Sequence, residues 1–267
     1  MIDIHGHIGQ FRDFDLSLQT LLENIERWRV KCVLVSNIDG AELPGITGNL
    51  DEAAANSATE EAVRAHPDCL RGLLWARPED GHPANLEPFV DKKLSDSDQS
   101  VFVGVKFHPE FNRFEADSAN VDPYLDFCER HQLPAVFHCG FPDSNSSPQR
   151  IYAIARRHPK VAVVLYHMGM GSDHSSAIDV VAESIAKSDA QLYLETAQSD
   201  ENAVFKAIER VGAERVLFGT DATYFGKYHY EEYASLVKAL HDKLPESQFH
   251  AIMHDNAKKL FRLDVAD

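Results

Sequence analysis

The chain has 267 residues, of which 44% are hydrophobic, and this length suits one large α/β domain or two small ones. A formal net charge of −16 argues against a nucleic-acid partner and against an anionic membrane surface. No apolar stretch is long enough to span a bilayer, and polar residues interrupt the N-terminus too early for a signal peptide. We therefore expect a soluble, cytoplasmic protein.

Short runs rich in β-branched residues recur along the chain and predict parallel strands that are buried on both faces. The predicted strands cover residues 2–5, 32–36, 72–75, 101–106, 135–138, 161–166, 191–195 and 215–219. Helical patterns separate most of them, beginning with an apolar stripe from Leu18 to Trp28. The later predicted helices cover residues 51–65, 121–131, 148–157, 175–187, 201–211, 230–240 and 256–263.

Strands that alternate with helices imply a parallel sheet. Eight such units in this length favour a closed (β/α)₈ TIM barrel over an open doubly wound sheet. No linker, repeat or low-complexity tract divides the sequence, so we predict a single domain over residues 1–267. The last predicted helix would be an extra one at the C-terminal side of the barrel.

The most informative local feature is a pair of histidines, His5 and His7, at the end of the first predicted strand. Side chains two residues apart on a strand point the same way, so these two imidazoles form half of a metal site. Three further ligand types follow apolar runs: His138, His167 and Asp221. One such residue alone would more often be a core histidine or a turn aspartate. Their repetition at several strand ends, which meet at one mouth in a barrel, favours a metal site.

The fourth predicted strand places Lys106 and His108 on one face, again by the two-residue alternation. A structural ion pair for Lys106 and a loop-capping role for His108 remain alternatives to a role in the site. Glu195, at the end of the seventh strand, is interpreted as an ion-pair partner rather than a metal ligand.

These residues form an ordered set that resembles the amidohydrolase superfamily, specifically the amidohydrolase-2 group of metal-dependent TIM-barrel hydrolases. The resemblance runs from residue 2 to about residue 263, where the segment Asn256-Ala257-x-x-Leu260-Phe261 is similar to the terminal helix of that group. Its motifs are His5-x-His7, Val105-Lys106-x-His108-Pro109, Phe137-His138-x-Gly140, His167-x-Gly169 and Leu217-Phe218-Gly219-Thr220-Asp221.

The resemblance implies one divalent ion, most often zinc, held by His5, His7, His138 and Asp221. Ligand type alone leaves manganese, iron and nickel open. Asp221 would take the proton of an activated water, and His167 would polarise the substrate or stabilise developing charge.

Lys106, together with His108, would bind a carboxylate or carbonyl of the substrate. In some relatives a lysine at this strand is carboxylated and bridges a second metal ion, which is the less favoured reading here. The sequence gives no oligomeric state, although barrels of this kind often form homodimers.

The expected function is hydrolysis of a small ester, lactone or amide. The alternative is a metal-dependent non-oxidative decarboxylase of a small carboxylic acid. Such relatives are typically longer near the N-terminus, whereas this chain runs almost directly from His7 into its first helix, and this favours the hydrolase. A TatD-like nuclease is opposed by the acidic charge and by Lys106, where that family has a glutamate. A non-catalytic scaffold protein would be expected to lack one of the metal-ligating residues, and all of the expected positions are filled here.

Overall fold

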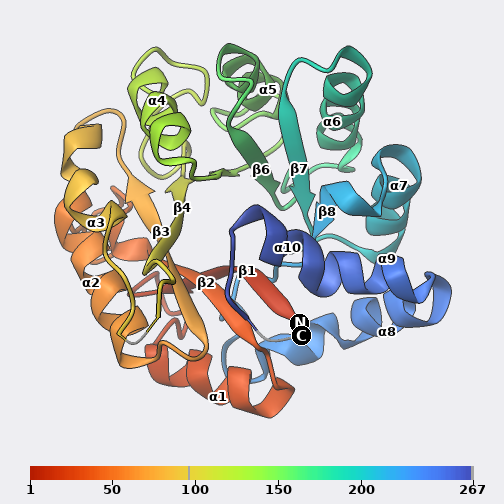
Figure 1. Cartoon of the computed structure of the whole chain (residues 1–267), viewed down its shortest axis with the longest axis horizontal. Helices are drawn as coiled ribbons and strands as arrows, with labels where there is room; N and C mark the ends of the chain where they lie inside the picture. The colour runs from red at the N-terminus through yellow and green to blue at the C-terminus, as the bar shows by residue number, and fades with distance from the viewer. Residues whose placement is uncertain (96, 266–267) are drawn as a thin grey trace.

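The computed structural model describes residues 1–95 and 97–265 and contains a sheet of eight parallel strands in sequence order. Helices surround the strands on the outside of the barrel (Figure 1). The strands are β1 (Ile2–Ile8), β2 (Cys32–Asn37), β3 (Leu70–Ala76), β4 (Phe102–Phe107), β5 (Ala135–His138), β6 (Ala162–Tyr166), β7 (Gln191–Glu195) and β8 (Val216–Leu217). The α-helices are α1 (Leu18–Trp28), α2 (Glu52–Ala65), α3 (Glu87–Val90), α4 (Asp122–His131), α5 (Pro148–Arg157), α6 (Ser175–Lys187), α7 (Glu201–Val211), α8 (Ala234–Lys243), α9 (Glu246–His250) and α10 (Asn256–Leu260).

The barrel is closed by backbone hydrogen bonds between β1 and the segment that contains β8. The amide of Ile4 donates to the carbonyl of Phe218 at 3.1 Å. Further along, the amide of His7 donates to the carbonyl of Ala222 at 2.6 Å, and the amide of Ala222 donates to the carbonyl of His5 at 2.9 Å. The predicted (β/α)₈ barrel with an additional C-terminal helix is therefore confirmed.

Two apolar layers hold this architecture. The barrel interior is filled by side chains from most of the strands, among them Ile4, Leu34, Val136 and Val164, all fully buried. The outer strand faces pack against the helices. Because both faces of these strands are covered, their sequences are continuous apolar runs rather than alternating ones. This explains why short apolar runs located the strands.

The structure differs from the predicted elements at several points, including a first strand that runs on to Ile8 and an unpredicted five-residue helix, α9. The strand predicted at 215–219 shrinks to Val216–Leu217, because the chain leaves the sheet toward a left-handed Asp221 with φ of 62°. The helix predicted at 230–240 starts as a 3₁₀ segment, Gly226–Tyr233, and continues as α8. The four-residue helix α3, between β3 and β4, was not predicted, since one turn is too short to give a helical period.

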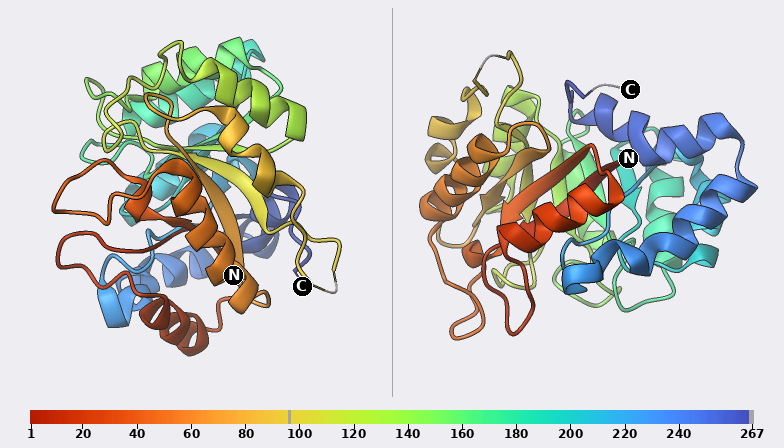
Figure 2. Two further views of the ribbon diagram at one scale, coloured as in Figure 1. Left: turned by 90° about the vertical axis from the view of Figure 1, so that its left-hand side faces the viewer. Right: turned by 90° about the horizontal axis from the view of Figure 1, so that it is seen from below.

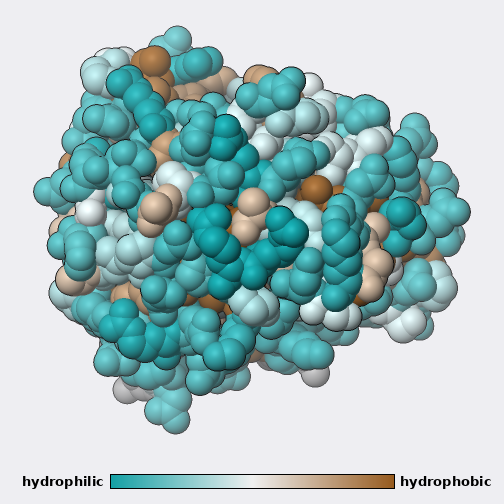
Figure 3. All heavy atoms as spheres, turned by 90° about the horizontal axis from the view of Figure 1, so that it is seen from above, coloured by the Kyte–Doolittle hydropathy of each residue, from teal (hydrophilic) through white to brown (hydrophobic). Residues whose placement is uncertain are grey.

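The two ends of the barrel differ in their covering. α10 crosses the end at which β1 begins (Figure 1), and the loops after β1 and β2 project from the opposite end (Figure 2, right). The side seen in Figure 3, over α4 to α6, is mostly hydrophilic with isolated apolar residues. Among the described residues, no helix is both long and apolar enough to cross a membrane.

Candidate functional site

The site lies at the mouth of the barrel, where the carboxyl ends of the strands meet, as is usual for active sites in this fold. The side chains of His5, Lys106, His108 and His167 are at least 96% buried there, since their exposed fractions are 1%, 0%, 4% and 2%. Fourteen histidines occur in the chain, and the structure brings five of them together at this end.

Three side chains form the centre of the site. The Nε2 atoms of His5 and His7 lie 3.3 Å apart, and they lie 3.3 and 3.6 Å from Oδ1 of Asp221. The backbone bonds of Ala222 to β1 produce this arrangement, because they fix Asp221 directly beside the two histidines. The last strand segment and the first are thus joined where the three polar atoms converge.

The Nδ1 atoms of both histidines face an oxygen atom on the side away from this centre. Nδ1 of His5 lies 3.3 Å from Oε2 of Glu195, and Nδ1 of His7 lies 3.4 Å from the carbonyl oxygen of Ser36. When Nδ1–H donates to these oxygens, the lone pairs of both Nε2 atoms face each other and a carboxylate oxygen. This is repulsive unless a cation lies between them. Two ligands about 2.1 Å from an ion at tetrahedral angles are roughly 3.4 Å apart, so the donor set fits a divalent metal.

His167 and His138 lie next to this centre but differ in position. The ligand atoms of His5, His167 and Asp221 all lie within 4.8 Å of one another, and His138 is outside this group. His138 instead packs its ring against His167, with 4.9 Å between centroids, and stacks on His108 at 4.1 Å. Nδ1 of His167 is buried without a hydrogen-bond partner. It is therefore available for a hydrogen bond with a bound molecule, as donor or acceptor according to the tautomer of the ring.

Lys106 is the most unusual group of the site. It is fully buried on β4, and its Nζ makes no hydrogen bond but lies 4.1 Å from the centre of the Tyr166 ring. Burial lowers the pKa of Lys106 to about 7, although the nearby carboxylates of Asp221 and Glu195 oppose the shift. Burial also raises the pKa of Asp221 to about 7, against the effect of Lys106. A buried, unpaired ammonium group is costly and calls for an anionic partner.

His108 forms the apolar side of the site. Its ring lies between Phe111, at a centroid distance of 3.8 Å, and His138. Nδ1 accepts a hydrogen bond from the amide of Phe111 at 3.3 Å, which leaves the proton of the neutral ring on Nε2. Burial holds the pKa of His108 well below its usual value of 6.5, so the ring is neutral. His108 can therefore act in the site as a neutral hydrogen-bond donor through Nε2–H.

The sequence did not reveal all the polar residues of the site. Gln198, in the loop after β7, donates from Nε2 to Oδ2 of Asp221 at 3.0 Å, and Ser36 holds His7 from β2. Nothing in their local pattern distinguishes them from loop and strand residues. Glu195 lies 3.3 Å from Nδ1 of His5, but burial holds the pKa of His5 well below its usual value of 6.5, so this contact is a hydrogen bond and not the predicted ion pair.

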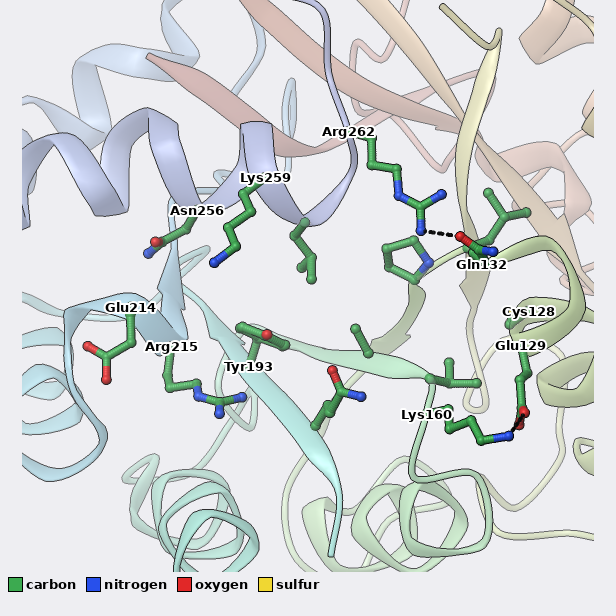
Figure 4. A pocket seen from close by; sticks show the side chains of 16 residues that line it. Cys128, Glu129, Gln132, Lys160, Tyr193, Glu214, Arg215, Asn256, Lys259 and Arg262 are labelled. Carbon is green, nitrogen blue, oxygen red and sulfur yellow. Dashed lines mark hydrogen bonds and ion pairs between the residues drawn. The ribbon is translucent and has the colours of Figure 1, made fainter. Parts of the chain in front are cut away.

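A depression at the other end of the barrel is a poor candidate for the active site. It has a volume of about 660 Å³ and lies beside α10, with Lys160, Arg215 and Arg262 in its lining (Figure 4). Lys160 is paired with Glu129 at 2.7 Å, and Arg262 donates to Gln132 at 2.9 Å. These charged groups have partners and are partly exposed to solvent, whereas the polar side chains at the mouth of the barrel are buried.

Comparison with known proteins places the chain in a family. The family model described as amidohydrolase matches residues 39–263, and no curated protein sequence matches. Similar solved structures include 2,6-dihydroxybenzoate decarboxylase from Rhizobium, with 17% identity, 98% of each chain covered and a TM-score of 0.70. Dihydroxybenzoic acid decarboxylase from a Polaromonas species, solved with manganese and an inhibitor, has 18% identity, coverage of 99% of this chain and 97% of its own, and a TM-score of 0.66. 4-Oxalomesaconate hydratase from Rhodopseudomonas palustris has 13% identity, coverage of 98% and 95%, and a TM-score of 0.69.

These neighbours correct the predicted activity. Decarboxylases predominate among the similar structures, so the prediction of a hydrolase for esters, lactones or amides is wrong, and the alternative is better supported. The length argument fails as well, because this chain and the Rhizobium enzyme each cover 98% of the other. The physical reason for the error is that one set of metal ligands serves several reactions. The predicted family itself is confirmed, since the family model covers most of the sequence: this chain belongs to the amidohydrolase family.

Proposed function

We propose that this protein is a metal-dependent enzyme that removes CO₂ from a small carboxylic acid without oxidation. The observation that carries the proposal is the buried Nζ of Lys106, which has no hydrogen-bond partner and lies near the carboxylates of Asp221 and Glu195. A carboxylate substrate would supply the missing anion. The decarboxylases of Rhizobium and Polaromonas, which share the fold, support the same reaction class.

In this proposal the divalent ion is held by His5, His7 and Asp221, with His138, which lies beside His167 and outside the closest group of ligand atoms, as the fourth ligand. When bound, it would neutralise substrate oxygens and so stabilise the negative charge that develops as CO₂ leaves. The similar Polaromonas enzyme contains manganese, whereas ligand chemistry alone favours zinc equally well. The metal-free protein should therefore be reconstituted with Mn²⁺ and with Zn²⁺ in separate experiments.

The remaining residues bind the substrate and move one proton. Nζ of Lys106 and the Nε2–H of His108 are donors for the substrate carboxylate or a neighbouring oxygen. The carbon–carbon bond to the carboxylate breaks, its electron pair stays on the substrate carbon, and CO₂ departs. Asp221 supplies the proton that forms the new C–H bond and is reprotonated from solvent. With a proton on its unpartnered Nδ1, His167 would donate a hydrogen bond to the developing negative charge.

The reaction is tested by product analysis. The metal-free protein, loaded with Mn²⁺ or Zn²⁺, is incubated with a panel of small aromatic and unsaturated carboxylic acids and with matched esters and lactones. We expect one CO₂ for each acid consumed and, in D₂O, one deuterium in the product at the carbon that lost it. A product that has gained one water would instead identify a hydratase, as in the similar Rhodopseudomonas enzyme. Consumption of esters without CO₂ release would reject the proposal.

The cellular setting remains part of the proposal. All four cysteines are free, and three of them are buried, in keeping with a reducing compartment such as the cytoplasm. A homodimer is the expected assembly, to be checked by sedimentation of the purified protein.

A further inference from the structure

Glu195 is a buried carboxylate that the proposed reaction does not use directly. It lies at the end of β7 with an exposed fraction of 0%. Oε2 accepts a hydrogen bond from the amide of His167 at 2.9 Å, and Oε1 accepts one from the amide of Ala197 at 2.5 Å. Burial raises the pKa of Glu195 well above its usual range, and the two backbone donors oppose that shift. Oε2 also lies 3.3 Å from Nδ1 of His5.

The neighbouring strand is shaped around this side chain. At Gly219, an added Cβ would lie 2.3 Å from Oε1 of Glu195 and 2.7 Å from its carboxyl carbon. No side chain larger than hydrogen fits there without moving the carboxylate. The close approach of Gly219 therefore fixes Glu195 in one place, rather than leaving it as an ion-pair partner free to reorient.

We infer that Glu195 is a positioning residue that sets the tautomer of His5 and the orientation of His167 together. With its proton on Nδ1 and donated to Glu195, His5 presents the Nε2 lone pair to the space shared with His7 and Asp221. The same oxygen holds the backbone of His167, whose φ of 64° is left-handed, so that its ring faces His5 at a centroid distance of 4.8 Å. One carboxylate thereby orients groups from β1 and β6.

Hydrogen-bond partners of this kind matter for metal binding because the coordinating nitrogen of a ligand histidine must carry a lone pair and no proton. Loss of such a partner typically lowers metal affinity by about 10- to 100-fold. The inference rests on the proposed function for its metal, but the tautomer of His5 is a property of the protein without metal. The two can therefore be tested separately.

The first measurement is the tautomer of His5 in the metal-free wild-type protein, from long-range ¹H–¹⁵N correlations of ¹⁵N-histidine at pH 7. The His5 signal is assigned by its loss in His5→Gln. We expect the proton on Nδ1. A proton on Nε2 would overturn the inference whether or not any variant folds.

The second measurement is made on Glu195→Gln. The amide cannot accept from both backbone donors, so one of its ends must face an N–H group. We expect part of the His5 population to shift to the Nε2–H form, and Mn²⁺ affinity, from competition with a fluorescent chelator, to fall about 10- to 100-fold. An unchanged tautomer with Mn²⁺ affinity within twofold of wild type would reject the positioning role.

Glu52→Gln is the matched control. Glu52 is also buried, with 3% exposed, and accepts bonds from the amide of Arg77 at 2.7 Å and from the hydroxyl of Tyr124 at 2.6 Å. This variant should lose thermal stability but keep the His5 tautomer and the Mn²⁺ affinity. If wild-type protein shows the expected tautomer and binds Mn²⁺ but releases no CO₂, the proposed function fails while the role of Glu195 stands.

Discussion

The Asp221→Asn variant is expected to lose turnover by roughly 10²- to 10⁴-fold, the usual range for removal of a group that transfers a proton. The amide keeps the shape of the side chain but neither carries the proton nor supplies a charged ligand. The fold should be retained. Asparagine tolerates the left-handed backbone, where φ is 62°, and can still accept a bond from Gln198. Its NH₂ group can also donate to the facing imidazole lone pairs in the metal-free protein.

The measurement is CO₂ release under saturating metal, together with the melting temperature of the metal-free protein. Asp200→Asn is the control, since Asp200 caps α7 through the amide of Ala203 and asparagine caps a helix equally well. The control should match wild type in both measurements. Turnover of Asp221→Asn at the wild-type level would exclude Asp221 as the proton donor.

Lys106→Met should separate stability from activity. Loss of a buried charge that pairs with the substrate typically costs about 2–5 kcal/mol, so kcat/KM is expected to fall roughly 30- to 5,000-fold. The free protein should nevertheless become more stable, by about 1–4 kcal/mol, because methionine fills similar volume without a buried, unpartnered Nζ. Chemical denaturation and steady-state kinetics on the same preparations test both effects.

The stability gain should depend on pH in a defined direction. Burial lowers the pKa of Lys106 from 10.5 to about 7, so the folded protein disfavours the charged lysine that the unfolded chain carries. This cost is fully present below pH 7 and disappears as the pH rises toward 10.5. The advantage of Lys106→Met over wild type should therefore shrink between pH 7 and pH 10. Lys238→Met, on the exposed surface, should show no such trend, and an equal advantage at both pH values would contradict the assignment.

The sequence predicted the barrel because its strands are buried on both faces and must be apolar throughout. It also predicted that polar residues at strand ends would meet, since parallel strands around a barrel share one mouth. The structure indeed brings His5, His7, His167 and Asp221 together. These conclusions depend only on periodicity and topology, which a single sequence contains.

Other features depend on side-chain reach and backbone detail and could not be predicted in this way. Gln198 reaches Asp221 from a loop, and Ser36 contacts Nδ1 of His7 through both its carbonyl oxygen, at 3.4 Å, and its hydroxyl oxygen, at 3.1 Å. The position of His138 beside His167, outside the closest group of ligand atoms, is a matter of ring packing. The type of reaction could not be predicted either, because hydrolases and decarboxylases can use the same metal ligands and differ in which bond of the substrate is broken.

The closure of the barrel has a consequence for how the protein is made. Asp3 and Thr220, which are hydrogen-bonded next to the site, are 217 positions apart in the sequence. The triad of His5, His7 and Asp221 spans the same seam, so it exists only after the longest-range pairing in the sheet has formed. A nascent chain on the ribosome would have no complete triad until residue 221 has emerged. Metal loading would then follow folding, and a tightly bound ion would mark molecules whose first and last strands have joined.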